Sequence, residues 1–192
     1  MSRTADLLAE VRACTLCVAE LEPRPVFQFG STARILVAGQ APGSKVHATG
    51  IPFDDPSGDR LRDWMGVDAE TFYDPSKIAL MPMGFCYPGK GRSGDNPPPP
   101  RCAVTWRRRL LARMPDIQFT LLVGRYAIDW HLPEQRKVSL SDTVRDWHQW
   151  APSLVPMPHP SPRNILWIRR RPWFDGEVVP AVRDFVQSAL AD

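Results

Sequence analysis

Residues 34–43 read RILVAGQAPG, a short apolar run that ends in a glycine-rich turn. Three more apolar runs of this kind occur in the chain, KIALMPM (77–83), FTLLVG (119–124) and SLVPMP (153–158). A strand that is covered on both faces is apolar throughout, whereas a half-exposed strand alternates between apolar and polar residues. The four runs therefore predict four buried strands.

Segments with helical apolar spacing separate these runs. Strands that alternate with helical crossovers form a parallel sheet covered on both faces. The sequence thus predicts an α/β fold, a three-layer α/β/α sandwich with a central, mainly parallel four-stranded sheet. A chain of 192 residues can bury one such core, so we expect a single domain over residues 1–192. The expected helices span 4–13, 58–66, 102–114, 125–132, 141–150 and 176–190.

The carboxyl ends of the predicted strands mark the expected binding site. These ends share one edge of a parallel sheet, and ligands of such sheets bind in the crevice outside it. The segments that follow the strands are GQAPG (39–43), GFCYPGKG (84–91), GRYA (124–127) and HPSPRN (159–164). None of them matches a phosphate-binding fingerprint. The two prolines of HPSPRN make a stiff loop, which holds His159 at low entropic cost.

Composition and charge leave the class of ligand open. The net charge is only +3, but arginines gather at 107–109 and at 163 and 169–171, close to Trp106, Trp167 and Trp173. Such clusters are typical both of solvated faces and of sites that bind phosphates and bases. The chain shows no signal-peptide pattern and no apolar run long enough to span a bilayer, so we expect a cytoplasmic protein.

Four cysteines suggest a metal site. Cys14 and Cys17 form a CxxC pair, and Cys86 and Cys102 follow later in the chain. Four cysteines in a cytosolic protein favour a metal or cluster over disulfides. Structural zinc, an iron–sulfur cluster and unrelated buried thiols are the alternatives.

Three motifs together resemble the uracil-DNA glycosylase superfamily. They are GQAPG (39–43), TGIPF (49–53) and HPSPRN (159–164), in the order that the family has. GQAPG is similar to the GEAPG motif of the iron–sulfur family of these enzymes, and HPSPRN is similar to the loop of the single-strand-selective enzymes. The resemblance implies a monomeric glycosylase that flips and hydrolytically excises uracil or another deaminated base from DNA, in base excision repair.

The resemblance also implies roles for individual residues. Gln40 and His159 would be catalytic, with His159 donating to the base O2, and Phe53 would stack on the base. The spacing of the cysteines resembles that of the ligands of a structural [4Fe–4S] cluster, with zinc as the alternative. Further contacts to the base are expected from Gly39, Ala41, Gly84, Phe85 and Asn164, contacts to DNA from Ser161, Pro162, Arg163, Arg169 and Arg170, and metal ligation from Cys14, Cys17, Cys86 and Cys102.

Two positions depart from the family pattern. Ala41 stands where the most active members carry an aspartate, and Gln40 can position a water but cannot accept its proton. Asp54, Asp55 and His47 are the alternative groups for this task. Pro82 stands where many relatives have the asparagine that reads the base, so that backbone amides of Gly84 and Phe85, or Asn164, would take over. Ala41 and Pro82 make a damage-binding protein with weak catalysis an alternative. A more remote alternative is a redox protein in which the cluster transfers electrons.

Overall fold

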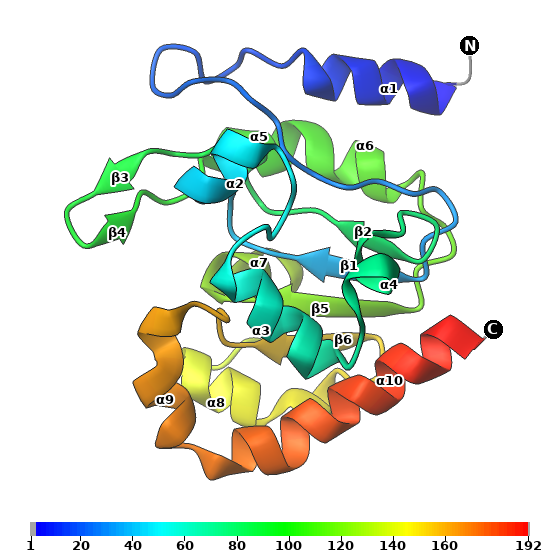
Figure 1. The fold of residues 1–192 in the computed structure, drawn as a ribbon, viewed down its shortest axis with the longest axis vertical. Helices are drawn as coiled ribbons and strands as arrows, with labels where there is room; N and C mark the ends of the chain where they lie inside the picture. The colour runs from blue at the N-terminus through cyan, green and yellow to red at the C-terminus, as the bar shows by residue number, and fades with distance from the viewer. Residues whose placement is uncertain (1–2, 192) are drawn as a thin grey trace.

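The computed structural model describes residues 3–191, and its centre is a four-stranded parallel sheet (Figure 1). The strand order is β2-β1-β5-β6, with β1 at Ile35–Ala38, β2 at Ile78–Leu80, β5 at Phe119–Val123 and β6 at Leu154–Met157. Every neighbouring pair is parallel. All four strands lie inside the predicted runs, and the predicted fold class is confirmed.

Helices cover both faces of this sheet. On one face, residues such as Val37 and Leu121 pack with Leu61, Phe72 and Phe174, which come from the helical layer formed by α3, α4, α8, α9, the π-helical turn η4 (Phe174–Val178) and α10. The helix bounds are α1 Arg3–Arg12, α2 Ser44–Thr49, α3 Pro56–Met65, α4 Ala69–Tyr73, α5 Pro100–Cys102, α6 Arg108–Leu111, α7 Arg125–His131, α8 Leu140–Arg145, α9 Ile165–Arg169 and α10 Val179–Ala191.

The opposite face carries a second apolar layer. Leu36 and Met81 pack there with Val11 of α1 and Leu110 of α6, and Leu122 packs with the residues of α7. Alternate residues of each strand therefore enter different layers, as the period of two along a strand requires. The molecule has the three layers that the sequence predicts. No helix within residues 3–191 has the length and apolarity needed to cross a membrane.

Several parts of the fold differ from the sequence-based expectation. Helices α2, α4 and α9 were not expected, the helix expected at 141–150 ends at Arg145, and the one expected at 176–190 begins with a π-helical turn, η4, at Phe174–Val178. The expected helix at 102–114 is interrupted by a π-helical turn, η1, at Ala103–Arg107. In addition, a small antiparallel hairpin of β3 (Lys90–Gly91) and β4 (Gly94–Asp95) projects from the body of the molecule (Figure 1). Each of its strands has only two residues, too few to give an apolar pattern in the sequence.

Candidate active site

A cleft of about 580 Å³ lies at the carboxyl ends of the strands. Its walls are the loop after β1, the segment that leads into α3, the β3–β4 hairpin and the loop after β6. This is the edge at which parallel sheets bind ligands. Of the predicted site residues, the cleft brings together Gly39, Gln40, Ala41, Phe53, His159, Ser161, Pro162, Arg163 and Asn164.

Phe53 lies beside the cleft in a strained backbone conformation. Its φ is 57°, in the left-handed region that bulky residues rarely adopt. A Cβ built at Gly39 would lie 3.1 Å from the ring of Phe53, and one built at Gly58 would lie 1.8 Å from its carbonyl oxygen. Both glycines therefore let this segment approach its neighbours closely. Strain of this kind is concentrated at functional sites.

His159 is held as a neutral imidazole with one defined tautomer. Its Nδ1 accepts a hydrogen bond from the backbone N–H of Ser161 (3.1 Å), so the proton of the neutral ring lies on Nε2. Burial lowers the pKa of His159, although the charges of Asp55 and Asp95 oppose this shift. At neutral pH the side chain is therefore a hydrogen-bond donor at Nε2 without a net charge.

The loop that carries His159 is fixed by two further side chains. Arg60 of α3 donates from Nη1 to the carbonyl oxygens of Pro160 (2.9 Å) and Ser161 (3.2 Å). Asn164 donates from Nδ2 to the carbonyl oxygen of His159 (2.8 Å). These contacts add to the stiffness that the prolines give the loop. Asn164 lines the cleft, but its amide nitrogen already has a structural partner.

Two carboxylates face the same part of the cleft. A methyl group built at Gly43 would lie 3.7 Å from Asp95 Oδ2 and 4.0 Å from Asp55 Oδ2. Asp55 uses Oδ1 to cap α3, accepting from the backbone N–H groups of Ser57 and Gly58. Tyr87 donates its hydroxyl to Asp95 Oδ1 (3.4 Å). Each carboxylate is therefore oriented through one oxygen and leaves the other one directed toward Gly43.

Asp55 was one of three alternative groups for positioning a water, and the structure separates them. Asp55 lines the cleft, whereas Asp54 lies outside the residues that line it. The ring of His47 lies outside the cleft and contacts Glu22 through Nε2 (3.3 Å). Sequence reasoning missed Asp95, because the short hairpin that brings it to the cleft leaves no periodic pattern in the sequence.

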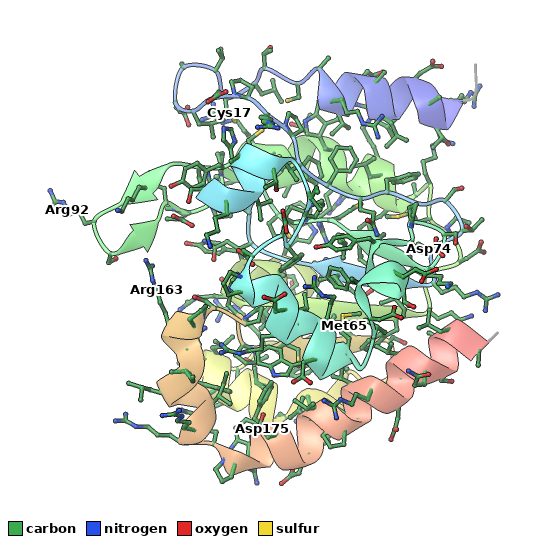
Figure 2. All side chains as sticks on the ribbon, viewed as in Figure 1. Cys17, Met65, Asp74, Arg92, Arg163 and Asp175 are labelled. Carbon is green, nitrogen blue, oxygen red and sulfur yellow. The ribbon has the colours of Figure 1, made fainter. Side chains whose placement is uncertain are left out.

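The hairpin and the loop after β6 touch across the mouth of the cleft. Arg163 extends from the loop toward the hairpin, whose tip carries Arg92 (Figure 2). Arg163 donates from Nη1 to the carbonyl oxygen of Ser93 (3.3 Å). Gly94 has a φ of 147°, which favours glycine, and a Cβ there would lie 2.4 Å from Arg163 Nη1, so a larger residue would displace the flexible end of Arg163. The side chain predicted to enter DNA thus contacts the hairpin.

Gly84 and Phe85 lie apart from the residues that line the cleft. Their backbone N–H groups were expected to read the base, but Gly84 N–H donates to the carbonyl oxygen of Gln40 (3.0 Å) and Phe85 N–H to Cys102 Sγ (3.4 Å). Neither residue lines the cleft, and Phe85 is buried against Phe27. The turn after β2 folds its amides back into the protein, so these two donors are not available to a ligand.

Arg169 and Arg170 lie near the end of α9, outside the cleft. Both are exposed. Arg171, the next residue, is instead ordered by stacking over Trp167, 4.5 Å from the ring centroid. Contacts of Arg169 and Arg170 to a bound nucleic acid stay a prediction.

All four cysteines line a second, smaller cavity behind the cleft. Its other walls are mainly apolar, with Leu16, Phe85 and Trp106 among them. Two of the sulfur atoms accept hydrogen bonds, Cys14 from Trp106 Nε1 (3.3 Å) and Cys102 from Phe85 N–H (3.4 Å). Burial raises the pKa of Cys102 to about 12. Within residues 3–191, no three His, Cys, Asp or Glu side chains form a group that could hold a metal ion, and a cofactor here stays a prediction.

A buried arginine lies between the two cavities. Arg107 is fully inaccessible and donates from Nη1 to the carbonyl oxygens of Met81 (2.9 Å) and Pro82 (3.4 Å). Its Nη2 and Nε donate to His131 Nε2 (2.9 and 3.2 Å). Burial lowers the pKa of Arg107 to about 10, which still leaves it charged at neutral pH. Burial and the charge of Arg107 lower the pKa of His131 to about 3.

We expect this pair to make stability depend on pH. His131 is neutral in the folded protein down to pH of about 3, but it titrates near 6.5 when unfolded. The contribution of neutral His131 to the free energy of unfolding is therefore complete above about pH 6.5. It is lost as the pH falls toward 3, at about 1.4 kcal/mol per pH unit. The free energy of unfolding should fall by about 1–2 kcal/mol between pH 6.5 and 5. His131→Gln should flatten this slope in denaturant titrations, and His148→Gln, at an exposed position, should leave it unchanged.

The fold and the cleft define the kind of chemistry that the protein can perform. A parallel α/β sheet whose carboxyl edge presents an aromatic ring, a neutral imidazole donor and two carboxylates is suited to holding a planar ring and breaking a bond beside it. A family model described as the uracil DNA glycosylase superfamily matches residues 27–183. The chain belongs to this superfamily, whose members are DNA glycosylases. Cys14 and Cys17 lie outside the matched residues.

Proposed function

We propose that this protein excises uracil, or another deaminated base, from DNA by hydrolysis of the N-glycosidic bond. The observation that carries the proposal is the state of His159: a neutral ring, fixed in the tautomer that donates from Nε2, at the edge of a cleft that also contains Phe53. A target base that leaves the DNA stack would enter this cleft and stack on the ring of Phe53.

The chemistry follows from the charges that develop. The bond between C1′ and the base nitrogen breaks, and its electron pair leaves with the base, which becomes anionic while the sugar becomes a cation. His159 donates from Nε2 to the base O2 and stabilises the anion. A water adds to C1′ and its proton passes to a carboxylate, while the departing base anion takes up a proton from solvent. The products are a free base and an abasic site.

We assign the nucleophilic water to the space in front of Gly43. The free oxygens of Asp55 and Asp95 flank this space, and their negative charges also stabilise the sugar cation. Gln40 is able to orient the water but not to accept its proton. The two carboxylates thus compensate for the absence of an aspartate at position 41.

A single methyl group tests this assignment. Gly43 has a φ of −82°, which any residue adopts, and the added Cβ would make ordinary van der Waals contacts. Gly43→Ala should fold normally yet displace the water, lowering the single-turnover rate of base release roughly tenfold or more. Gly176→Ala is the matched control, since a Cβ there meets nothing within 4 Å. An unchanged rate in Gly43→Ala would show that the nucleophilic water does not bind in this space.

For the cysteine cavity we propose a structural [4Fe–4S] cluster held by Cys14, Cys17, Cys86 and Cys102. Supporting the proposal, the four thiols share one apolar cavity and two of them accept N–H hydrogen bonds, the kind of contact that tunes cluster sulfurs. A bound cluster would cross-link the loop after α1 to the segment at 86–102. It would take no part in base cleavage.

Arg163 should matter most for paired DNA. We propose that it leaves Ser93 and fills the gap that the flipped nucleotide opens in the stack, where a guanidinium plane can stack on neighbouring bases. Because a single strand has no partner base to support, Arg163→Ala should slow base release from double-stranded DNA several-fold more than from single-stranded DNA. Arg169→Ala, at an exposed arginine nearby, should affect both substrates equally. Equal losses in Arg163→Ala would make Arg163 an ordinary phosphate contact.

A second function is a damaged-DNA-binding protein with weak catalysis, favoured by the lack of a carboxylate in residues 39–43. A base-release assay with oligonucleotides that carry uracil, hypoxanthine, xanthine or a thymine mismatch separates the two functions. Release of any base supports the enzyme, and tight binding of damaged DNA without release supports the binder.

A further inference from the structure

We propose that Arg107 is a positioning residue for the leaving base: a permanent positive charge, fixed behind the floor of the cleft, that stabilises the base as it becomes anionic. This inference rests on the proposed function and deepens it. It concerns a charged side chain that touches neither DNA nor the base and acts through the end of β2.

Arg107 forms hydrogen bonds to the segment that follows β2, and part of this segment forms the floor of the cleft. Nη1 donates to the carbonyl oxygens of Met81 and Pro82, and Pro82 lines the cleft. Pro82 has no N–H, and the N–H groups of the next residues donate to protein atoms. The floor therefore offers few donors of its own, but it has a guanidinium directly behind it.

The guanidinium of Arg107 has no carboxylate partner. Within residues 3–191, its hydrogen-bond partners are the carbonyl oxygens of Met81 and Pro82 and the ring of His131. His131, which accepts from Nε and Nη2, stays neutral and so orients the guanidinium without cancelling its charge. An uncompensated buried charge is costly to folding, and a well-packed apolar residue would often be as stable or more stable. Its presence therefore points to an electrostatic task.

That task matches the position of the charge. The base develops negative charge at the moment its bond to the sugar breaks, and a fixed charge in a low-dielectric interior needs no reorganisation to stabilise it. His159 acts on the base from the loop after β6, whereas Arg107 acts from the opposite side, behind the end of β2. The two groups would thus share the stabilisation of one anion.

The experiment compares two leaving groups in two variants. Single-turnover release of uracil and of 5-fluorouracil, whose anion is more stable, is measured with the full-length wild-type protein, Arg107→Met and Arg107→Lys. We expect Arg107→Met to slow uracil release roughly 10- to 100-fold and 5-fluorouracil release clearly less. Arg107→Lys keeps the charge and should stay near the wild type. Visible absorption and thermal unfolding of each variant identify any loss of cofactor or fold.

A second measurement does not depend on turnover. Fluorine NMR of free 5-fluorouracil bound to the protein reports the pH at which the bound base ionises. In the wild type this pH should lie below its value in solution, and in Arg107→Met the difference should disappear. Equal slowing of both leaving groups, an unchanged ionisation in Arg107→Met, or a lysine variant that behaves like one without charge would each overturn the role of Arg107. A wild-type protein that neither binds nor releases any pyrimidine would instead overturn the proposed function itself.

Discussion

His159→Ala is expected to lower the single-turnover rate of base release by roughly 10²–10³, the loss typical of removing one donor to a developing anion. The reason is that Nε2–H is a fixed donor: Ser161 N–H occupies Nδ1, and burial keeps the ring neutral. DNA affinity should change little, because the donor acts on charge that develops only in the transition state.

His159→Gln is the informative companion variant. Its side-chain amide can still donate, so it should recover part of the lost rate, whereas Ala cannot. Comparison of circular dichroism spectra and unfolding midpoints excludes a collapsed loop, which Arg60 and Asn164 hold independently of the ring. If His159→Ala releases base at the wild-type rate, the proposed mechanism is wrong.

The second large effect concerns the cysteines. Protein purified without oxygen should be brown, with the broad visible absorption of thiolate-to-iron charge transfer. Cys17 lies on the loop after α1 (Figure 2), and Cys17→Ala should lose the colour and more than about 4 kcal/mol of unfolding free energy, because metal binding energy is folding energy.

Two controls make this result decisive. Thr15→Ala changes an exposed residue between Cys14 and Cys17 and should keep both colour and stability. Iron and zinc content of the wild-type protein is measured in the same samples. Colourless protein that contains one zinc per chain would show that the four thiolates bind zinc and not a cluster. Metal-free protein with full stability would show that the four cysteines are only buried thiols.

The strands could be predicted from the sequence because each one is buried on both faces. Ile35–Ala38 and Phe119–Val123 are buried at every position, and so the first reads as an unbroken apolar run and the second as one interrupted only by Thr120. The loops that follow the strands could be predicted to meet, since a parallel sheet brings its carboxyl ends to one edge. His159 was found in this way, whereas Phe53 was assigned from the resemblance of TGIPF to the family motif.

Other features depend on contacts that no local pattern encodes. The sequence has three consecutive arginines at 107–109 and does not distinguish between them. The phase of the π-helical turn buries Arg107 and exposes Arg108 and Arg109. Asp95 lines the cleft because the pairing of β3 with β4, two residues from each strand, places the hairpin beside the cleft. The amides of Gly84 and Phe85 were expected in the site, but their tertiary partners, Gln40 and Cys102, turn them away from it.

Base release under single-turnover conditions tests the central claim most directly. Excess wild-type protein, prepared without oxygen, is incubated with a single-stranded oligonucleotide that contains one uracil, and with the same oligonucleotide containing cytosine. We predict that one free uracil and one abasic site form per uracil strand, while the cytosine strand stays intact. DNA that is bound by the protein but keeps its uracil after prolonged incubation would contradict the assignment as a glycosylase acting on uracil.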